Sequence, residues 1–372
     1  MNPQVQINSN DDLLEFTLSG VNVSIANAIR RTMLSDIPLV VFRTTPHEEN
    51  KATIHVNTTR LNNEIIKQRL SCIPIHIKNI AEFPLKNYLL EVNVENKTDT
   101  IMYVTTEDFV IKDLVSGKPL DKSKIREVFP ADDYTGYFID FIRLRPKISD
   151  EIPGEKIHLT CEFDIGSAKE DGMFNAVCTG AYGATVDVVT QSAELEKKKQ
   201  TWKDEGKTPD EVKFEAENWL LLDGKRIIIK DSFDFKVQSV GIYTNHEIVD
   251  KSCEILIKKL DEQETLIEKD ELEIKKAENT MENSYDIILE NEDYTIGKVL
   301  EYLLYTKFYE TKMLTFCGFK KMHPHDNYSI IRVAYKDAVE ISTIKGHLKE
   351  CIGDGKQIFG KIKKDMLKAV KD

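Results

Sequence analysis

Apolar residues near the start of the chain recur with the period of a helix. Between residues 22 and 36 they occupy every fourth position, at Ile25, Ile29 and Met33, with small alanines beside them. This spacing places these side chains on one narrow face of a helix that Ser24 can cap. Arg30 and Arg31 lie off that face. The pattern predicts an amphipathic helix whose apolar face packs either on its own domain or against a partner helix.

A related pattern returns near the end of the chain. Thr295 stands where a second helix would be capped, and it follows Ser24 at an offset of 271 residues. In both places a strand-like stretch, a hydroxyl residue, a branched apolar residue and a small residue occur in the same order. The second helix has a broader apolar face, formed by Ile296, Val299, Leu300, Leu303 and Leu304. Two related units on one chain predict an internal pair in which each half covers the apolar helices of the other.

The pattern between these two units divides the chain further. Residues 1–40 and 183–262 are expected to form one discontinuous domain, because strand-like alternation returns after residue 225 and a long amphipathic helix begins near Glu247. Residues 41–182 alternate strands with a short helix and predict an α+β insert. Residues 263–282 are acidic with few large apolar side chains, which indicates a helical or frayed linker. The last domain, residues 283–372, should end in two amphipathic helical stretches separated by a Gly-containing break.

Composition and charge limit the chemistry. The 372 residues carry a formal charge of -12, so the average surface repels phosphates and contact with DNA is expected only through a partner. The six cysteines form no CxxC pair, which predicts neither a disulfide framework nor a metal site. Without a long apolar run or a basic N-terminal start, we expect a soluble intracellular protein and no membrane contact. Phosphate-loop, dinucleotide, zinc-protease and serine-hydrolase motifs are absent from the sequence, so neither independent catalysis nor a cofactor is expected.

Two stretches of the first half carry a resemblance to a known family. The run from Asn27 to Arg31, followed by Pro38, resembles the first dimerisation helix of the alpha-like subunits of multisubunit RNA polymerases, whose pattern is Asn-Ala-Leu-Arg-Arg before Ile/Val-Pro. The stretch from residue 57 to 75 is similar to the next signature of that family, and the matching positions are Asn57, Thr58, Leu61, Glu64, Arg69, Leu70, Ile73 and Pro74. Gln68, Ser71 and Cys72 depart from this signature.

Other stretches extend the resemblance to both members of the alpha-like pair. Lys169 and Glu170 weakly match an element of the larger archaeal and eukaryotic subunit. The second half resembles the small alpha-like partner, with matches at Glu292, Asp293, Thr295, Ile296, Gly297, Gly318, Phe319, Lys320, His323 and Pro324. One chain that carries both is similar to the fused subunit of large nucleocytoplasmic DNA viruses. The implied fold is α+β, with the alpha-like dimerisation fold twice in one chain and an α+β insert in the first copy.

The resemblance implies a non-catalytic assembly platform. The two halves would pair within the chain through Ile25, Ile29 and Met33 on one side and the broader second face on the other. The platform would then nucleate assembly of the two large catalytic subunits, with small polymerase subunits as further partners and no need for a homo-oligomer.

The predicted contacts with a large subunit are Arg30, Arg31, Glu64 and Arg69. For Glu64 and Arg69, a local pair or cap within the insert is an open alternative. A second reading of the whole chain is a scaffold that uses this fold in a non-polymerase complex. A viral source would place the protein in a viral factory of the host cytoplasm and also in the virion.

Overall fold

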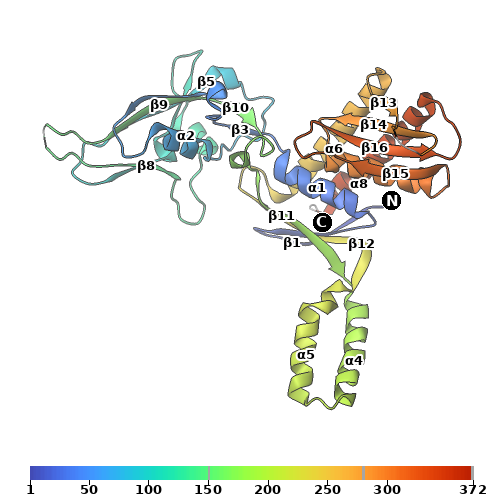
Figure 1. Cartoon of the computed structure of the whole chain (residues 1–372). Coiled ribbons are helices and arrows are strands. Elements are labelled where there is room, and N and C mark those ends of the chain that lie inside the picture. The colour runs from blue at the N-terminus through green and yellow to red at the C-terminus, as the bar shows by residue number, and fades with distance from the viewer. Residues whose placement is uncertain (150, 279–280, 370–372) are drawn as a thin grey trace. The chain divides into compact units, whose positions relative to one another are not determined.

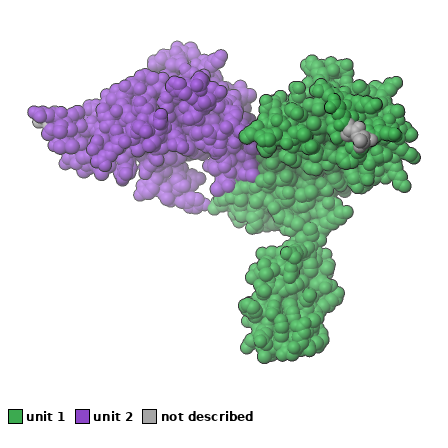
Figure 2. All heavy atoms as spheres, in the orientation of Figure 1, with its two compact units in different colours: residues 1–33, 179–238, 245–372 green, residues 34–178, 239–244 purple. Residues whose placement is uncertain are grey.

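The chain separates into two compact units, each with its own sheets. A computed structural model describes residues 1–149, 151–278 and 281–369. Unit 1 contains residues 1–33, 179–238 and 245–372, and unit 2 contains residues 34–178 and 239–244 (Figure 2). Unit 2 therefore interrupts unit 1 in the sequence, whereas the first strands and the C-terminal helices belong to the same unit.

The first sheet of unit 1 has the strand order β1-β2-β12-β11. Its strands are β1 (Gln4–Asn10), β2 (Leu14–Ser19), β11 (Val177–Val186) and β12 (Ile228–Ser239). Alternate side chains of β2 are buried, and Phe16 stacks on Phe235 of β12 with ring centroids 4.8 Å apart. Gly20 then turns the chain into helix α1 (Val23–Ser35) with φ +72°, and a Cβ there would lie 2.4 Å from the carbonyl oxygen of Asn2. Only glycine fits this turn.

The second sheet of unit 1 has the strand order β13-β14-β16-β15 and is accompanied by the C-terminal helices (Figure 1). Its strands are β13 (Ile274–Lys276), β14 (Ser284–Glu290), β15 (Leu314–Lys320) and β16 (Tyr328–Tyr335). The helices are α6 (Asn245–Glu268), α7 (Tyr294–Leu304) and α8 (Ile341–Ala369). The predicted Gly-containing break in the last helix is wrong, because α8 runs without interruption through Gly353 and Gly355. The buried neighbours Ile352 and Ile358 continue one packed face across these glycines.

The predicted acidic linker, residues 263–282, contains regular structure in its described part. Helix α6 continues through Glu268, and β13 pairs antiparallel with β14. Residues 279 and 280 lie outside the described residues. The acidic composition of the stretch therefore accompanies ordered backbone on both sides of residue 270.

A helical hairpin of unit 1 connects β11 to β12 (Figure 1). It consists of α4 (Val188–Asp204) and α5 (Pro209–Leu221). Thr208 caps α5 in a reciprocal capping box with Glu211, and Pro209 occupies the first turn. Both helices are largely solvated, because only Leu195 of α4 and Val212 and Ala216 of α5 are buried.

Unit 2 is built around the sheet β4-β9-β5-β7. These strands are β4 (Ala52–Asn57), β5 (Tyr88–Glu95), β7 (Val110–Asp113) and β9 (Lys156–Glu162). Two further pairs are β6 (Met102–Thr105) with β8 (Asp140–Leu144) and β3 (Leu39–Val41) with β10 (Asp164–Gly166). Helices α2 (Asn63–Ser71) and α3 (Lys122–Val128) complete the unit. Its core includes the buried aromatic side chains Phe42, Phe109, Phe129, Phe141 and Phe163.

Within the described ranges, no helix is both long enough and apolar enough to cross a membrane.

Candidate functional site

The two related helices begin at the caps Asn22 and Asp293, two residues before Ser24 and Thr295, and Asp293 was among the residues expected to cap the second helix. The side-chain oxygen of Asn22 accepts a hydrogen bond from the backbone N–H of Ser24 at 2.9 Å, so Ser24 lies inside α1. At α7 the cap is Asp293, whose carboxylate accepts from the N–H of Thr295 at 2.8 Å. Asn and Asp are at least as good caps as Ser and Thr, which explains the shift. The two observed caps keep the offset of 271 residues between them, from position 22 to position 293.

The side chains predicted to join the two halves are all buried. On α1 they are Ile25, Ile29 and Met33, and on α7 they are Ile296, Val299, Leu300, Leu303 and Leu304. Burial agrees with the amphipathic pattern of both helices. The pairing of these two faces with each other stays a prediction.

Helices α6 and α8 pack side by side in unit 1 and carry a ladder of ion pairs. Lysines of α8 meet carboxylates of α6, and that of Asp270 just past the end of α6, in reverse sequence order, so the two helices run antiparallel. The pairs are Lys345–Asp270, Lys349–Glu268 at 2.6 Å, Lys356–Glu264 at 2.5 Å, Lys356–Asp261 at 2.8 Å, Lys363–Glu254 and Lys363–Asp250 at 3.5 Å. The hydrogen bond to Asp261 is the largest cause that raises the pKa of Lys356. Part of the acidic segment predicted as a linker therefore complements the lysines of α8.

Gly355 allows α8 to approach its neighbours closely. A Cβ at this position would lie 3.0 Å from Cδ1 of Leu260 on α6 and 3.5 Å from Cδ1 of Leu303 on α7. At Gly353, one half-turn away, a Cβ would meet nothing within 4 Å. The close contact between α8, α6 and α7 therefore depends on one particular glycine.

Arg31 connects α1 to the first turn of α7 within unit 1. Its Nη2 lies 2.5 Å from a carboxylate oxygen of Asp293, and its Nε donates to the hydroxyl of Thr295 at 2.9 Å. Burial raises the pKa of Asp293, but the hydrogen bonds from Thr295 and the charge of Arg31 outweigh burial, and the pKa is lowered. Arg30 is half-buried, and its Nε donates to Asn27 on the same helix at 3.0 Å. The two adjacent arginines thus have different roles in the folded chain.

The residues of the second signature lie on and around α2 in unit 2. Asn62 caps this helix by accepting from the N–H of Ile65 at 2.8 Å, and Glu64 is exposed in the first turn. Arg69 donates to the carbonyl oxygen of Phe141 at 2.7 Å and to that of Asp140 at 2.9 Å. The alternative of a local pair within the insert therefore applies to Arg69 in part, because its guanidinium links α2 to strand β8 through these hydrogen bonds. Its contact with a large subunit stays a prediction, as does that of Glu64.

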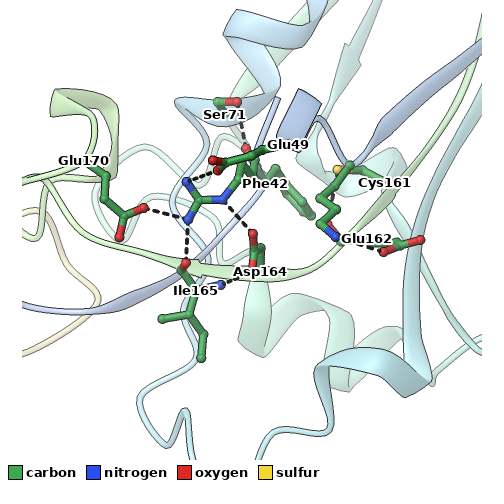
Figure 3. A network of polar contacts seen from close by, with 10 residues as sticks. Phe42, Glu49, Ser71, Cys161, Glu162, Asp164, Ile165 and Glu170 are labelled. Carbon is green, nitrogen blue, oxygen red and sulfur yellow. Dashed lines mark hydrogen bonds and ion pairs between the residues drawn. The ribbon is translucent and has the colours of Figure 1, made fainter. Parts of the chain in front are cut away.

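Arg43 organises a polar network that the sequence did not reveal. Its partners Glu49, Asp164, Ile165 and Glu170 are labelled in Figure 3. Its side chain is only 11% exposed and lies 2.6 Å from Asp164, 2.7 Å from Glu170 and 3.5 Å from Glu49. It also donates to the carbonyl oxygen of Ile165 at 2.7 Å. Burial lowers the pKa of Arg43, but the hydrogen bonds and charges of Asp164 and Glu170 outweigh it, and the pKa is raised. Glu170, a weak match in the sequence, thus has a structural partner.

Burial affects three cysteine thiols of unit 1. Burial raises the pKa of Cys253, Cys317 and Cys351 to about 12, so these thiols are protonated at neutral pH. In the part of the chain that the structure describes, no group of three or more His, Cys, Asp or Glu side chains is placed to hold a metal ion.

Several known proteins that are similar to this chain bear the names of RNA polymerase subunits. The "DNA-directed RNA polymerases I and III subunit rpac1" of Dictyostelium discoideum is 27% identical over 285 residues, covering 66% of this chain and 76% of that protein. The corresponding human subunit, RPAC1, is 26% identical over 201 residues, covering 49% of this chain and 54% of that protein. The "DNA-directed RNA polymerase subunit Rpo3" of Pyrococcus furiosus is 30% identical over 105 residues, covering 27% of this chain and 38% of that protein.

The chain also matches the model of a protein family. Residues 15–260 match the RNA polymerase Rpb3/Rpb11 dimerisation domain, from β2 into α6. The match covers more than half of the chain and stops before α7 and α8. The chain therefore belongs to the Rpb3/Rpb11 dimerisation-domain family of RNA polymerase proteins.

Proposed function

We propose that this chain is the alpha-like assembly subunit of a multisubunit DNA-directed RNA polymerase. The observation that carries the proposal is the antiparallel α6–α8 packing with its ladder of ion pairs, in a chain that belongs to a dimerisation-domain family. The three relatives described above bear the names of RNA polymerase subunits. Catalysis would reside in the large subunits, and this chain would supply the surface on which they assemble.

In this proposal the two halves of the chain, residues 1–262 and 283–372, replace two separate subunits. The α6–α8 ladder and the Arg31–Asp293 contact both connect the first half to the second. A partner tethered by a short connection experiences an effective concentration on the order of mM. Fusion would therefore form the platform without a separate bimolecular step. A natural fusion of this kind is the basis for proposing a large DNA virus as the source.

The proposed contacts with the large subunits begin from Arg30 and Glu64. Glu64 is exposed on α2, and only the Nε of Arg30 is bonded within the described chain. Arg31 and Arg69 would act indirectly, because their hydrogen bonds within the chain hold α1 and β8 in position. Guanidinium groups suit interfaces because they bind carboxylates through two parallel hydrogen bonds. The protein would work where transcription takes place, which for a viral chain is the viral factory and the virion.

The first test is recovery of partners. We expect tagged full-length protein, purified from cells that make the whole complex, to bring down two large polymerase subunits identified by mass spectrometry. Arg30→Glu should reduce their recovery, whereas Arg226→Glu, at a side chain 84% exposed, should not. If no large polymerase subunit is recovered with the unchanged chain, the scaffold in a non-polymerase complex becomes the better reading.

The second test concerns pairing of the halves. A protease site placed at residues 269–273, between α6 and β13, allows the folded chain to be cut. We expect both fragments to elute together in size-exclusion chromatography. Lys349→Glu with Lys356→Glu should weaken their association, because these lysines face carboxylates of α6. Lys364→Glu with Lys368→Glu, on the same helix but outside the ladder, is the matched control. Separation of the unmutated fragments would overturn internal pairing.

A further inference from the structure

Four of the ten arginines of this acidic chain line one cleft of unit 2. The cleft has a volume of about 790 Å³ and lies beside the β6–β8 pair. Its arginines are Arg60, Arg69, Arg143 and Arg145. Between them the lining is largely apolar and includes the side chains of Ile101 and Tyr103, which are 55% and 52% exposed. Positive groups and exposed apolar groups therefore share one concave surface, whose lining also includes the carboxylates of Asp140 and Glu155.

Two of these arginines are held in place by the fold. Arg69 is bonded to the carbonyl oxygens of Asp140 and Phe141, as described above. The Nε of Arg145 lies 2.5 Å from one carboxylate oxygen of Glu155, and its backbone N–H donates to the other at 2.7 Å. The side chain of Glu155 is only 7% exposed. The walls of the cleft are therefore set before any ligand arrives, which lowers the entropic cost of binding.

The other two arginines are available to a ligand. Arg60 and Arg143 are exposed, and among the described residues no carboxylate lies within ion-pair distance of either. Arg143 stands opposite Tyr103 in the β6–β8 register. Residues directly opposite in an antiparallel pair have side chains on the same face of the sheet. One unpaired guanidinium therefore lies next to an exposed aromatic ring.

We propose that this cleft binds an extended acidic segment of another subunit of the same assembly. The identity of the owner rests on the proposed function, whereas the chemistry rests on the cleft. Carboxylates suit the two unpaired guanidinium groups, and apolar side chains between the carboxylates suit Ile101 and Tyr103. A nucleic acid would bring a continuous row of phosphates over this partly apolar lining and towards a protein of net charge -12. The observations therefore favour an acidic peptide segment over a nucleic acid.

The direct test uses the purified full-length chain and a fluorescein-labelled peptide of alternating glutamate and tyrosine. We expect saturable binding that weakens as salt is raised. Arg60→Glu with Arg143→Glu should weaken binding by at least about tenfold, because attraction becomes like-charge repulsion. Lys122→Glu with Lys124→Glu on α3 makes the same charge change outside the cleft and should leave binding unaltered. An unchanged melting temperature shows that the cleft variant is folded.

Three outcomes would overturn the inference. One is equal peptide affinity of the cleft variant and the α3 control. Another is tighter, cleft-dependent binding of single-stranded DNA of equal charge, which would make the cleft a phosphate site. The third is that the peptide binds at the cleft but the tagged chain recovers no other subunit. The proposed function then fails, and with it the assignment of the acidic segment to another subunit. If subunits are recovered but the peptide test fails, the cleft inference falls and the proposed function stands.

Discussion

Gly355 offers a sensitive test of how closely α8 packs against α6. Replacing a helical glycine with alanine normally stabilises a helix by up to about 1 kcal/mol, because alanine loses less backbone entropy on folding. At Gly353 nothing lies within 4 Å of the new Cβ, so Gly353→Ala should show this gain. At Gly355 the new Cβ would lie 3.0 Å from Leu260, and ordinary carbon contacts begin near 3.4 Å. The leucine or the helix must therefore move.

The expected sizes follow from this contact. Overpacking a well-packed core costs about 1–3 kcal/mol, so Gly355→Ala should lose the helical gain and end less stable than Gly353→Ala by about that amount. In a domain of this size, each kcal/mol shifts the melting temperature by about 2–4 °C. Thermal unfolding, with hydrogen exchange of α6 and α8 peptides as a local readout, measures the difference between the two variants. Both substitutions are glycine to alanine in one helix, so propensity cancels in the comparison.

A double-mutant cycle identifies the clashing group. Leu260→Ala alone should destabilise unit 1 by about 2–5 kcal/mol, because it leaves a cavity in a buried site. Combined with Gly355→Ala, the loss should be smaller than the sum of the two single effects, since the new methyl group enters the space that leucine vacates. Strict additivity, or equal stabilisation by Gly353→Ala and Gly355→Ala, would refute the close contact between α6 and α8.

Three further predictions concern charged and titratable groups. Because the pKa of Asp293 is lowered in the folded chain, its ionised carboxylate stabilises the fold above the ordinary pKa of 3.8, and this stabilisation is lost as the pH falls through the folded-state pKa. Asp293→Asn should therefore lower the free energy of unfolding in urea by about 1 kcal/mol at neutral pH and by almost nothing in acid. Burial lowers the pKa of His347 from 6.5, so the wild-type chain should lose stability as pH falls below about 6.5, and His347→Gln should flatten that dependence. Arg43→Lys cannot keep the forked contacts of the guanidinium and should destabilise unit 2 by about 1–3 kcal/mol, whereas Arg126→Lys on the exposed part of α3 should change little by the same measurement.

The sequence was informative wherever one periodic face decides the outcome. The strand before Gly20 and the helix after it were predicted from apolar spacing, and the structure places them at Leu14–Ser19 and Val23–Ser35. The first cap was misplaced because several polar residues at a helix start can accept the same N–H groups, and pattern alone does not decide among Asn22, Ser24 and their neighbours.

Ion pairs between distant parts of the chain could not be predicted from the sequence, for a different reason. A stretch rich in acidic residues has the composition of a solvated linker, and only the position of α8 shows that lysines such as Lys349 and Lys356 lie opposite it. Arg43 is a similar case, because its partners Asp164 and Glu170 are more than 100 residues away in the sequence. A sequence pattern records local periodicity, whereas these contacts depend on which distant elements meet.

The contact between Arg31 and Asp293 also bears on why the halves would pair with each other and not with copies of themselves. On the proposed duplication, the position equivalent to Arg31 in the second helix is 302, and the position equivalent to Asp293 in the first is 22. These positions hold Tyr302 and Asn22, so the ion pair that symmetry would place there is replaced by two uncharged side chains. Two first halves would place Arg31 opposite the neutral Asn22, and two second halves would leave the Asp293 carboxylate opposite tyrosine. On the proposed pairing, only the mixed pair joins the cation to the anion, which would give the two halves a specificity that apolar faces alone do not provide.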